Sequence, residues 1–169
     1  NKKINLVIEG EDTELDKSVI DELLDPIMHC VRNSLDHGIE TPDVRKAAGK
    51  NEEGTLLLKA SNEGNMIVID IVDDGHGIDV EKVKNKAIQR GLIHPNKIIT
   101  DQEAYQLIFA AGFSTADKIT NVSGRGVGLD VVKTQIEKLN GSIIVTSEPG
   151  LGTKFSIRLP LTVAIIQGL

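Results

Sequence analysis

The sequence predicts an α+β fold in which a mixed, mostly antiparallel sheet carries its helices on one face. Several segments place apolar residues at helical spacing, and several others alternate polar and apolar residues as strands do. The two kinds of segment occur in groups, without regular β-α-β alternation, and at least two pairs of strands are joined by short turns. We therefore expect a two-layer α/β sandwich.

The strands follow from period-two alternation and from the turns between them. In the first strand, Ile4, Leu6 and Ile8 alternate with polar residues and predict one buried face. The turns Asn-Glu-Gly-Asn and Glu-Pro-Gly-Leu-Gly predict two antiparallel hairpins. The expected strands are residues 2–9, 55–61, 66–73, 142–147 and 154–159.

The longest expected helix begins at about Asp16, after Asp12 or Thr13 as its cap, and ends at Gly38 as a left-handed stop. Apolar residues at three- and four-residue steps predict its buried stripe, which consists of Leu24, Met28, Val31 and Leu35. On the adjacent arc, His29 and Asn33 point the same way, one turn apart. This position beside an apolar contact suits a ligand site. The alternative is a surface helix that carries histidines on its polar side.

The other helices are predicted from their caps and stops. Thr41 is the expected cap of a short charged helix with Pro42 at its first position, and Thr100 is the expected cap of a later one. These helices cover residues 42–48, 80–90, 101–109 and 127–139. Residues 110–122 show no clear periodicity, which predicts a functional lid or a disordered loop. We expect helices 25–38 and 127–139 to lie side by side on the sheet, with a pocket between them and this loop.

Composition narrows the classes of function. A chain of 169 residues with 40% hydrophobic residues can form one domain, and 2% aromatic residues predict an aliphatic core. The net charge of -6 argues against a nucleic-acid or membrane surface, since such partners require a basic face. Cys30 is the single cysteine, which excludes disulfides and predicts a small buried side chain. No apolar run approaches the roughly 20 residues of a membrane span, and no signal peptide opens the chain, so a cytoplasmic protein is expected.

Residues 73–77, Asp-Asp-Gly-His-Gly, end a strand that is predicted to be buried. There the Asp73 carboxylate can accept a hydrogen bond from an exocyclic amine in an apolar pocket, while Gly75 and Gly77 allow the backbone to approach a flat ring. An ordinary Asp-Gly turn is the alternative. A calcium-binding loop is a poor alternative, because the acidic residues do not follow EF-hand spacing.

Residues 123–128 carry glycine at alternate positions, namely Gly124, Gly126 and Gly128, directly before a predicted helix. Uncovered backbone N–H groups at a helix N-terminus favour phosphate, and Arg125 adds a positive charge. The spacing matches neither a P-loop nor a dinucleotide fingerprint. A glycine-rich turn that packs a helix closely on a strand is the alternative.

Asn33 is the candidate ligand for magnesium, because this ion prefers oxygen ligands and is commonly held by one or two protein groups together with substrate phosphates. Imidazole suits softer metals, so we expect His29 to orient a metal-bound water or a phosphate. His37 lies at the end of the helix, where a cation is favoured, so a capping histidine is the alternative for it. His94 is expected on the surface.

Four segments in this order resemble the nucleotide-binding boxes of the superfamily that joins gyrase, heat-shock chaperone ATPases, histidine kinases and mismatch-repair ATPases. They are H-C-V-R-N-S-L-D-H-G-I-E, D-D-G-H-G-I-D, G-F-S-T and S-G-R-G-V-G-L-D-V-V. Within the superfamily they resemble the catalytic domain of the chemotaxis histidine kinases, over essentially the whole chain. The resemblance implies a Bergerat-type ATP-binding fold for residues 1–160. Residues 161–169 would begin a linker to a following regulatory domain, and the chain, which lacks an initial methionine, would be a piece of something larger.

The resemblance also implies a site for ATP and Mg²⁺. Asn33 would bind the metal, His29, Arg32 and His37 would line the phosphate side, and Asp73 would hold the adenine amino group. The catalytic group would be His29, Asn33 and His37. The nucleotide-binding group would be Arg32, Asp36, Asp73, Gly75, Gly77, Ile78, Lys82, Ser114, Lys118, Ser123, Gly124, Arg125, Gly126, Val127, Gly128, Leu129 and Thr153, with residues 114–122 as the ATP lid.

The position of His29 is occupied by a glutamate general base in the ATPase branches of the superfamily. Without a carboxylate to activate water, the resemblance implies phosphoryl transfer to a protein. The chain lacks the H-E-x-x-R-P type of box that carries an acceptor histidine, so the acceptor would lie on a separate phosphotransfer domain. Flanking dimerisation and regulatory domains would link this domain, itself monomeric, to a coupling protein and receptors. An ATPase and a nucleotide-sensing module without catalysis are the alternatives.

Overall fold

The computed structural model describes residues 2–10, 17–113 and 128–160. Its five-stranded sheet has the order β1-β2-β3-β5-β4, in which β1 runs parallel to β2 and the other neighbours are antiparallel. This arrangement confirms the predicted mixed, mostly antiparallel sheet. The strands are β1 (Lys3–Glu9), β2 (Glu53–Glu63), β3 (Met66–Asp73), β4 (Ser142–Glu148) and β5 (Gly152–Pro160).

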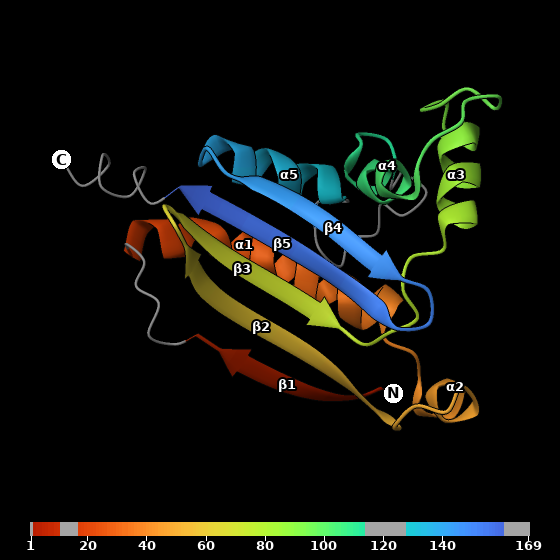
Figure 1. The fold of residues 1–169 in the computed structure, drawn as a ribbon, viewed down its shortest axis with the longest axis horizontal. Coiled ribbons are helices and arrows are strands. Elements are labelled where there is room, and N and C mark those ends of the chain that lie inside the picture. Colours follow the sequence, from red (N-terminus) through yellow and green to blue (C-terminus); the bar gives the residue numbers. More distant parts are fainter. Residues whose placement is uncertain (1, 11–16, 114–127, 161–169) are drawn as a thin grey trace, which may run out of the picture.

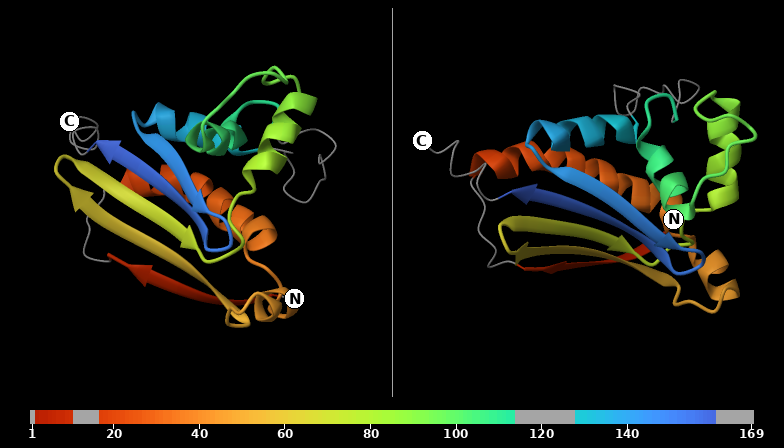
Figure 2. Two further views of the ribbon diagram at one scale, coloured as in Figure 1. Left: turned by 45° about the vertical axis from the view of Figure 1, so that its right-hand side comes forward. Right: turned by 45° about the horizontal axis from the view of Figure 1, so that its top comes forward.

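Helices α1 (Lys17–Asn33) and α5 (Leu129–Lys138) form the second layer of the sandwich (Figures 1 and 2). They contact each other and lie side by side on one face of the sheet, as predicted. The described helices are α1 (Lys17–Asn33), a π-helical turn (Ser34–Gly38), α2 (Pro42–Ala47), α3 (Val80–Gln89), α4 (Asp101–Gln106), a 3-10 turn (Leu107–Phe109) and α5 (Leu129–Lys138). Among the described residues, no helix combines the length and the apolar character that a bilayer crossing requires.

The main core lies between the sheet and the pair α1 and α5, and it is largely aliphatic, as the composition predicts. Phe109 and Phe155 meet edge to face in it, with ring centroids 6.1 Å apart. A smaller apolar cluster joins α3 and α4 through Val83, Ala87, Ile99, Ala104 and Phe113. The α3–α4 unit is therefore packed around its own apolar centre beside the main sandwich.

The predicted apolar stripe of α1 is wrong for two of its four residues. Leu24 is 53% exposed and Met28 is 49% exposed, whereas Leu23 and Cys30 are buried in the core. Apolar residues occupy two neighbouring stripes of this helix, and spacing alone does not say which stripe faces the sheet. Cys30 is completely buried, as predicted.

Gly38 is not the left-handed stop that was predicted, because its φ is not positive. The helix ends instead in a π-helical turn, where the Ile39 N–H donates to the Ser34 carbonyl at 2.9 Å. The backbone at Gly38 approaches Asp73 closely, since a Cβ at this position would lie 3.1 Å from the Asp73 Oδ2 atom and would press on the carboxylate. The predicted caps Asp12 and Thr13 lie outside the described residues.

The predicted buried face of β1 is also largely exposed. Leu6 pairs with Leu56 of β2, so both side chains point to the helical side of the sheet. Leu56 is buried, but Leu6 and Ile8 are more than half exposed. The reason is that β1 is an edge strand and lies beyond the area that α1 and α5 cover.

The opposite edge strand, β4, is covered by α4. Gln106 accepts a hydrogen bond from the Val145 N–H at 3.0 Å, and Gln102 donates to the Val145 carbonyl at 3.0 Å. The Tyr105 hydroxyl donates to the Ser147 carbonyl at 3.1 Å. Because these side chains satisfy backbone groups that a neighbouring strand would otherwise pair, α4 is held against the end of β4. The helix itself begins at the predicted cap, Thr100, which forms a capping box with Glu103.

Candidate functional site

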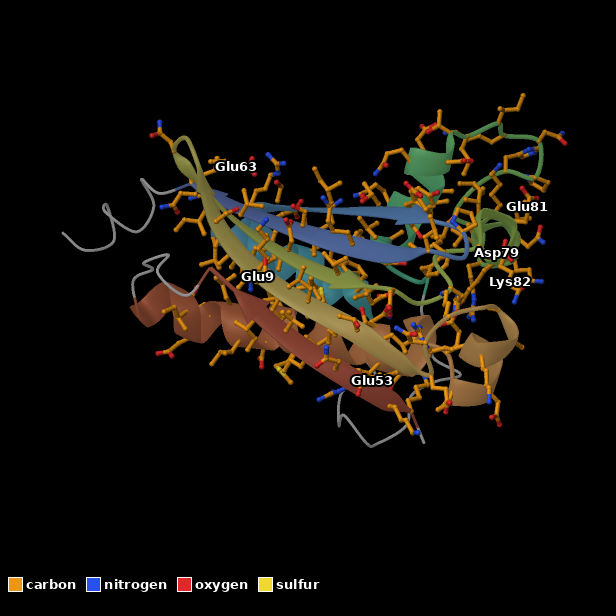
Figure 3. The ribbon with its side chains drawn as sticks, turned by 60° about the horizontal axis from the view of Figure 1, so that its bottom comes forward. Glu9, Glu53, Glu63, Asp79, Glu81 and Lys82 are labelled. Atoms are coloured by element: carbon orange, nitrogen blue, oxygen red, sulfur yellow. The ribbon has the colours of Figure 1, made fainter. Side chains whose placement is uncertain are left out.

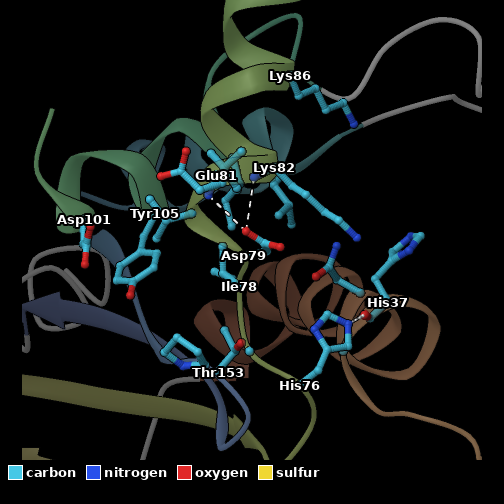
Figure 4. Close-up of a pocket in the computed structure, with 18 of the residues that line it drawn as sticks. His37, His76, Ile78, Asp79, Glu81, Lys82, Lys86, Asp101, Tyr105 and Thr153 are labelled. Atoms are coloured by element: carbon cyan, nitrogen blue, oxygen red, sulfur yellow. Dashed lines mark hydrogen bonds between the residues drawn. The ribbon is translucent and has the colours of Figure 1, made fainter. Parts of the chain in front are cut away.

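A cavity of about 900 Å³ opens beside the carboxyl end of β3, between the end of α1 and the α3–α4 unit (Figure 4). Its size is typical of a site for a drug-sized ligand or a cofactor. Polar and charged side chains share its wall with an apolar patch. The lining residues are Asn33, His37, Gly38, Asp73, His76, Gly77, Ile78, Asp79, Val80, Glu81, Lys82, Val83, Lys86, Asp101, Tyr105, Ile108, Phe113, Leu129, Pro149, Thr153 and Phe155.

Asp73 is the most buried charged side chain of the described cavity lining and is only 4% exposed. It ends β3 and lies opposite Thr153 on β5. Burial raises the pKa of the Asp73 carboxyl, although the hydrogen bond from the Gly75 N–H and the proximity of the Ser34 side chain and the Thr153 backbone partly counteract this rise. A carboxylate in such a setting is a strong acceptor for a ligand N–H group.

The turn after Asp73 is held close to the end of α1. The Gly75 N–H donates to Asp73 Oδ1 at 2.9 Å, and the His76 N–H donates to the Gly38 carbonyl at 3.0 Å. A Cβ at position 75 would lie 2.0 Å from the Gly38 carbonyl oxygen, and Gly77 has a φ of +82°. Glycine is thus required at both positions for the turn to keep its shape.

Two hydroxyl groups outside the described lining lie near the paired residues Asp73 and Thr153. Ser34 is 1% exposed, and its Oγ atom has no hydrogen-bond partner of standard geometry among the described residues, although it lies close enough to lower the Asp73 pKa. Ser147 Oγ accepts from the Ile78 N–H at 2.7 Å and lies 3.2 Å from Thr153 Oγ1. A buried hydroxyl without a full set of partners is the kind of group that a ligand or a bound water satisfies.

The end of α1 supplies the second polar wall. Asn33 and His37 line the cavity, and His76 Nε2 lies 2.6 Å from the His37 carbonyl oxygen, so the ring nitrogen donates to it (Figure 4). His29 is half-buried, and it is not among the described lining residues. Within the described ranges, no group of three or more His, Cys, Asp and Glu side chains could hold a metal ion. The amide oxygen of Asn33 suits a magnesium ion that takes its other ligands from phosphate and water.

The third wall is the first half of α3. Asp79 Oδ1 accepts from the backbone N–H groups of Glu81 at 3.0 Å and Lys82 at 3.2 Å, so it caps the helix. Figure 3 shows Asp79, Glu81 and Lys82 together at this end of the molecule, far from Glu63 at the turn between β2 and β3. Lys82 extends from α3 toward the side that carries His37 (Figure 4). Lys86, one turn further, also lines the cavity, with its Nζ atom 4.8 Å from the centre of the Phe113 ring.

The structure brings eight of the sequence-predicted site residues to this cavity. They are Asn33, His37, Asp73, Gly77, Ile78, Lys82, Leu129 and Thr153. Gly75 follows Asp73 by two residues and is not part of the described lining. Arg32 and Asp36 are exposed and also lie outside this lining, and Gly128 is the N-cap residue of α5. The predictions for Ser114, Lys118, Ser123, Gly124, Arg125, Gly126 and Val127 fall outside the described residues, as does most of the predicted lid.

Sequence reasoning missed several residues of the cavity wall. Lys86 follows Lys82 by four positions and so shares its side of α3, which is a signal that could have identified it. His76 lies inside the Asp-Asp-Gly-His-Gly segment, but nothing in the spacing indicates that its ring reaches the end of α1. Tyr105 and Phe113 come from the α3–α4 unit, whose placement on the cavity depends on the tertiary fold.

Comparison with curated proteins shows close similarity to chemotaxis proteins. The chain is 70% identical to the chemotaxis protein CheA of Treponema pallidum over 99% of its own length. It is 62% identical to CheA of Borreliella burgdorferi over its full length, and 53% identical to CheA of Bacillus subtilis. The chain spans 21%, 20% and 25% of these relatives, respectively.

Solved structures show the same fold at much lower sequence identity. The histidine kinase domain of the blue-light activated histidine kinase EL346 from Erythrobacter litoralis matches with a TM-score of 0.56 at 15% identity, over 97% of this chain and 58% of that one. The catalytic domain of the histidine kinase ThkA matches with a TM-score of 0.54 at 18% identity, over 93% of this chain and 78% of that one. These matches support the predicted Bergerat-type fold.

A family model described as histidine kinase-, DNA gyrase B- and HSP90-like ATPase matches residues 22–163, which include every described element from α2 to β5 and most of α1. The match covers the strand end with Asp73, the helix end with Asn33 and the glycine-rich segment before α5. The chain belongs to the family of histidine kinase-, DNA gyrase B- and HSP90-like ATPases.

Proposed function

We propose that this chain is the ATP-binding domain of a chemotaxis histidine kinase and that it transfers the γ-phosphoryl group of Mg-ATP to a histidine on a separate phosphotransfer domain. The observation that carries the proposal is that Asp73 and Asn33 line one cavity. The names of the relatives and the family match support the same function. The domain would comprise residues 1–160.

The purine would bind at the Asp73 end of the cavity. The buried carboxylate can accept a hydrogen bond from the exocyclic amine of adenine, and the Ser34 hydroxyl lies beside this carboxylate. Ile78 and Phe155 line the cavity and offer apolar surface to a flat ring. Guanine carries a carbonyl oxygen where adenine carries this amine, so a carboxylate would repel it. The site should therefore select adenine.

The triphosphate would extend toward Asn33 and the lysines of α3. Bound magnesium would supply charge neutralisation on the phosphate oxygens, with the Asn33 amide oxygen as its protein ligand. Lys82 and Lys86 add positive charge on the same side, and His37 lines the adjacent wall. The predicted phosphate-binding residues Arg32, Ser114, Lys118 and those at 123–128 would act there as well. These residues position the triphosphate and compensate its charge.

The residue one helical turn before Asn33 favours phosphoryl transfer to a protein acceptor over hydrolysis of ATP. This residue is His29, where the ATPase branches of the superfamily carry a glutamate base. A general base contributes about 10²- to 10⁴-fold to attack by water. With no carboxylate at this position, catalysis would rest on positioning and on charge neutralisation.

The chain spans about one fifth of two of its CheA relatives, so the acceptor and the regulatory parts are proposed to lie elsewhere in a longer protein. The phosphotransfer domain would be the direct partner. Dimerisation and regulatory domains would connect the kinase to a coupling protein and receptors, as the resemblance implies. The setting would be cytoplasmic.

The test combines nucleotide titration with a transfer assay. Calorimetric titration of the chain with ATP and with GTP, each with magnesium, should show binding of ATP and much weaker binding of GTP. The chain is then mixed with γ-labelled Mg-ATP and a purified phosphotransfer domain from a chemotaxis kinase. We expect label on a histidine of that domain and little free phosphate when the domain is omitted.

The outcomes separate the alternatives. Tight ATP binding with no label on the added domain would contradict the kinase proposal and leave a nucleotide-sensing module. Rapid release of phosphate without an acceptor would instead indicate an ATPase. Equal affinities for ATP and GTP would contradict the assignment of the purine end to Asp73.

A further inference from the structure

Arg45 is a buried charged residue that the cavity does not contain. It belongs to α2, it is 1% exposed, and no described lining residue of the cavity is part of α2. Fully buried arginines are rare unless they are paired. The partners of this guanidinium therefore indicate what it holds in place.

The Arg45 side chain is bonded to three segments. Its Nε–H donates to the Asn51 carbonyl at 2.6 Å, and its NH1 group donates to Glu40 Oε1 at 2.9 Å. The guanidinium also contacts Asp74 twice, since NH1 donates to the backbone carbonyl and NH2 donates to Oδ2, both at 3.0 Å. The planar fork of an arginine can satisfy all of these acceptors at once, which a lysine cannot do.

Lys50 also forms hydrogen bonds to the turn that follows Asp73. Its ammonium group donates to the carbonyl oxygens of Asp74 at 3.0 Å and Gly75 at 2.7 Å, and to Glu40 Oε2 at 2.9 Å. Glu40 thus bridges the two cations. Burial raises the pKa of Glu40, but the hydrogen bond from Lys50 and the charges of Lys50 and Arg45 outweigh this effect, so its pKa lies below the usual value.

The network ends one residue from the purine end of the cavity. Asp74 is also anchored to β2, because its Oδ1 atom accepts from the Thr55 N–H at 2.8 Å. The next N–H in the chain, that of Gly75, donates to Asp73 Oδ1. The turn of residues 73–75 is therefore held on one side by Arg45 and Lys50, and on the other side by its close contact with Gly38.

An apolar contact does not explain how α2 is attached. The helix has only six residues, and its one large apolar side chain, Val44, is 54% exposed. Gly54 in β2 leaves room for the Ile39 side chain, since a Cβ there would lie 2.5 Å from it, whereas the Arg45 guanidinium would be at an ordinary contact distance of 3.5 Å. The polar contacts of Arg45 and Lys50 are thus the main link between α2 and the Asp73–Gly75 turn.

We propose that Arg45 is a positioning residue for purine recognition, which sets the orientation of the Asp73 carboxylate by holding the Asp74–Gly75 backbone from outside the cavity. The inference rests on the proposed function of Asp73. Loss of Arg45 would leave the carboxylate in place but allow it to rotate away from the ligand amine. Selectivity for that amine would then fall, beyond any general loss of affinity.

The experiment measures the preference for ATP over inosine triphosphate, which carries a carbonyl oxygen in place of the 6-amino group. The dissociation constants of both nucleotides, with magnesium, are determined for the wild-type chain and for Arg45→Met, Arg45→Lys and Lys50→Met. Lys46→Met is the matched control, because it removes a positive charge from an exposed position of the same helix. Thermal unfolding monitors whether each variant is folded at the titration temperature.

We expect the wild type to prefer ATP by at least about tenfold, the effect of one well-placed hydrogen bond. Arg45→Met should reduce this preference by about tenfold, and Lys50→Met should reduce it by a smaller factor. Arg45→Lys should retain part of it, while Lys46→Met should match the wild type. If Arg45→Met does not fold, Arg45→Lys and Lys50→Met decide the question, because they leave fewer buried groups unpaired.

Two results would overturn the positioning role. One is a wild-type preference that persists unchanged in the folded Arg45 and Lys50 variants. The other is an equal loss of affinity for both nucleotides, which a merely structural effect would produce. A wild type that binds ATP and inosine triphosphate equally well would instead contradict the purine role of Asp73 itself, so the two failures are distinguishable.

Discussion

Asn33 at the end of α1 and Asp73 at the end of β3 line the same cavity, although a helix turn, α2 and a complete β-hairpin separate them along the chain. In the proposed function, Asn33 would offer a neutral oxygen to a metal, and Asp73 would offer a buried carboxylate to a purine amine. Because both open into one space, a single ligand with a base at one end and phosphates at the other can reach both.

Asp73→Asn should weaken ATP binding by about 10²-fold or more without destabilising the chain at neutral pH. The amide keeps an oxygen for the Gly75 N–H, but its NH₂ group opposes the adenine amine. Isothermal titration gives the affinity, and urea unfolding gives the stability. An affinity within a factor of about three of the wild type, less than one hydrogen bond is worth, would contradict the prediction.

The same variant should change how stability depends on pH. Burial raises the pKa of Asp73 in the folded chain above its usual value of about 3.9, so the folded state favours the protonated acid. As pH rises from the usual pKa through the raised pKa, the unfolded chain loses this proton first. The contribution of the protonated Asp73 to the stability of the folded chain is then lost. The free energy of unfolding of Asp73→Asn relative to the wild type should therefore increase from acidic to neutral pH. Parallel profiles in urea unfolding would contradict this expectation.

Asn33→Ala should abolish magnesium-dependent phosphoryl transfer and leave binding of the adenine end largely intact. The substitution removes the amide oxygen from the cavity wall but does not touch Asp73 or its hydrogen bonds. Binding of adenosine without magnesium should equal that of the wild type, while transfer to a phosphotransfer domain should be lost. Normal transfer by the variant would exclude Asn33 as the metal ligand.

Gly75→Ala should destabilise the chain by about 2 kcal/mol or more, as overpacking does. The new Cβ would lie 2.0 Å from the Gly38 carbonyl oxygen, which forces the end of α1 away from the turn. Gly64→Ala is the control, because Gly64 has a φ of +61° but no atom within 4 Å of its ideal Cβ. The control should cost about 1 kcal/mol, which is the backbone term alone. Gly75 itself has no positive φ, so its loss would come from the contact, and a free energy of unfolding within about 0.5 kcal/mol of the wild type would contradict the predicted clash with Gly38.

Cys30 should be inert to thiol reagents in the folded chain. Burial raises its pKa to about 12, so at pH 8 only about 10⁻⁴ of the thiol would be ionised. Reaction with a chromogenic disulfide should be slow without denaturant and complete within minutes in concentrated urea. Fast labelling of the folded chain would show that α1 separates readily from the sheet.

Local signals in the sequence predict most of the architecture. Alternation and turn residues indicate all five strands, and the Thr100 cap indicates the start of α4. The two segments that carry Asn33 and Asp73 are also recognisable from the residues alone, because each is a continuous motif of a few positions. These features depend on near neighbours along the chain, so the sequence itself specifies them.

Only the tertiary structure decided which groups are buried and what they contact. Spacing placed Leu24 and Met28 in the buried stripe of α1, but the orientation of the helix on the sheet buries Leu23 instead, next to Cys30, whose burial was predicted. In the sequence, Arg45 is one charge among several on a short helix. It is buried because Glu40 and Asp74 converge on it from separate segments of the fold. A charge is buried only where partners that are distant in sequence surround it, and local periodicity does not predict these partners.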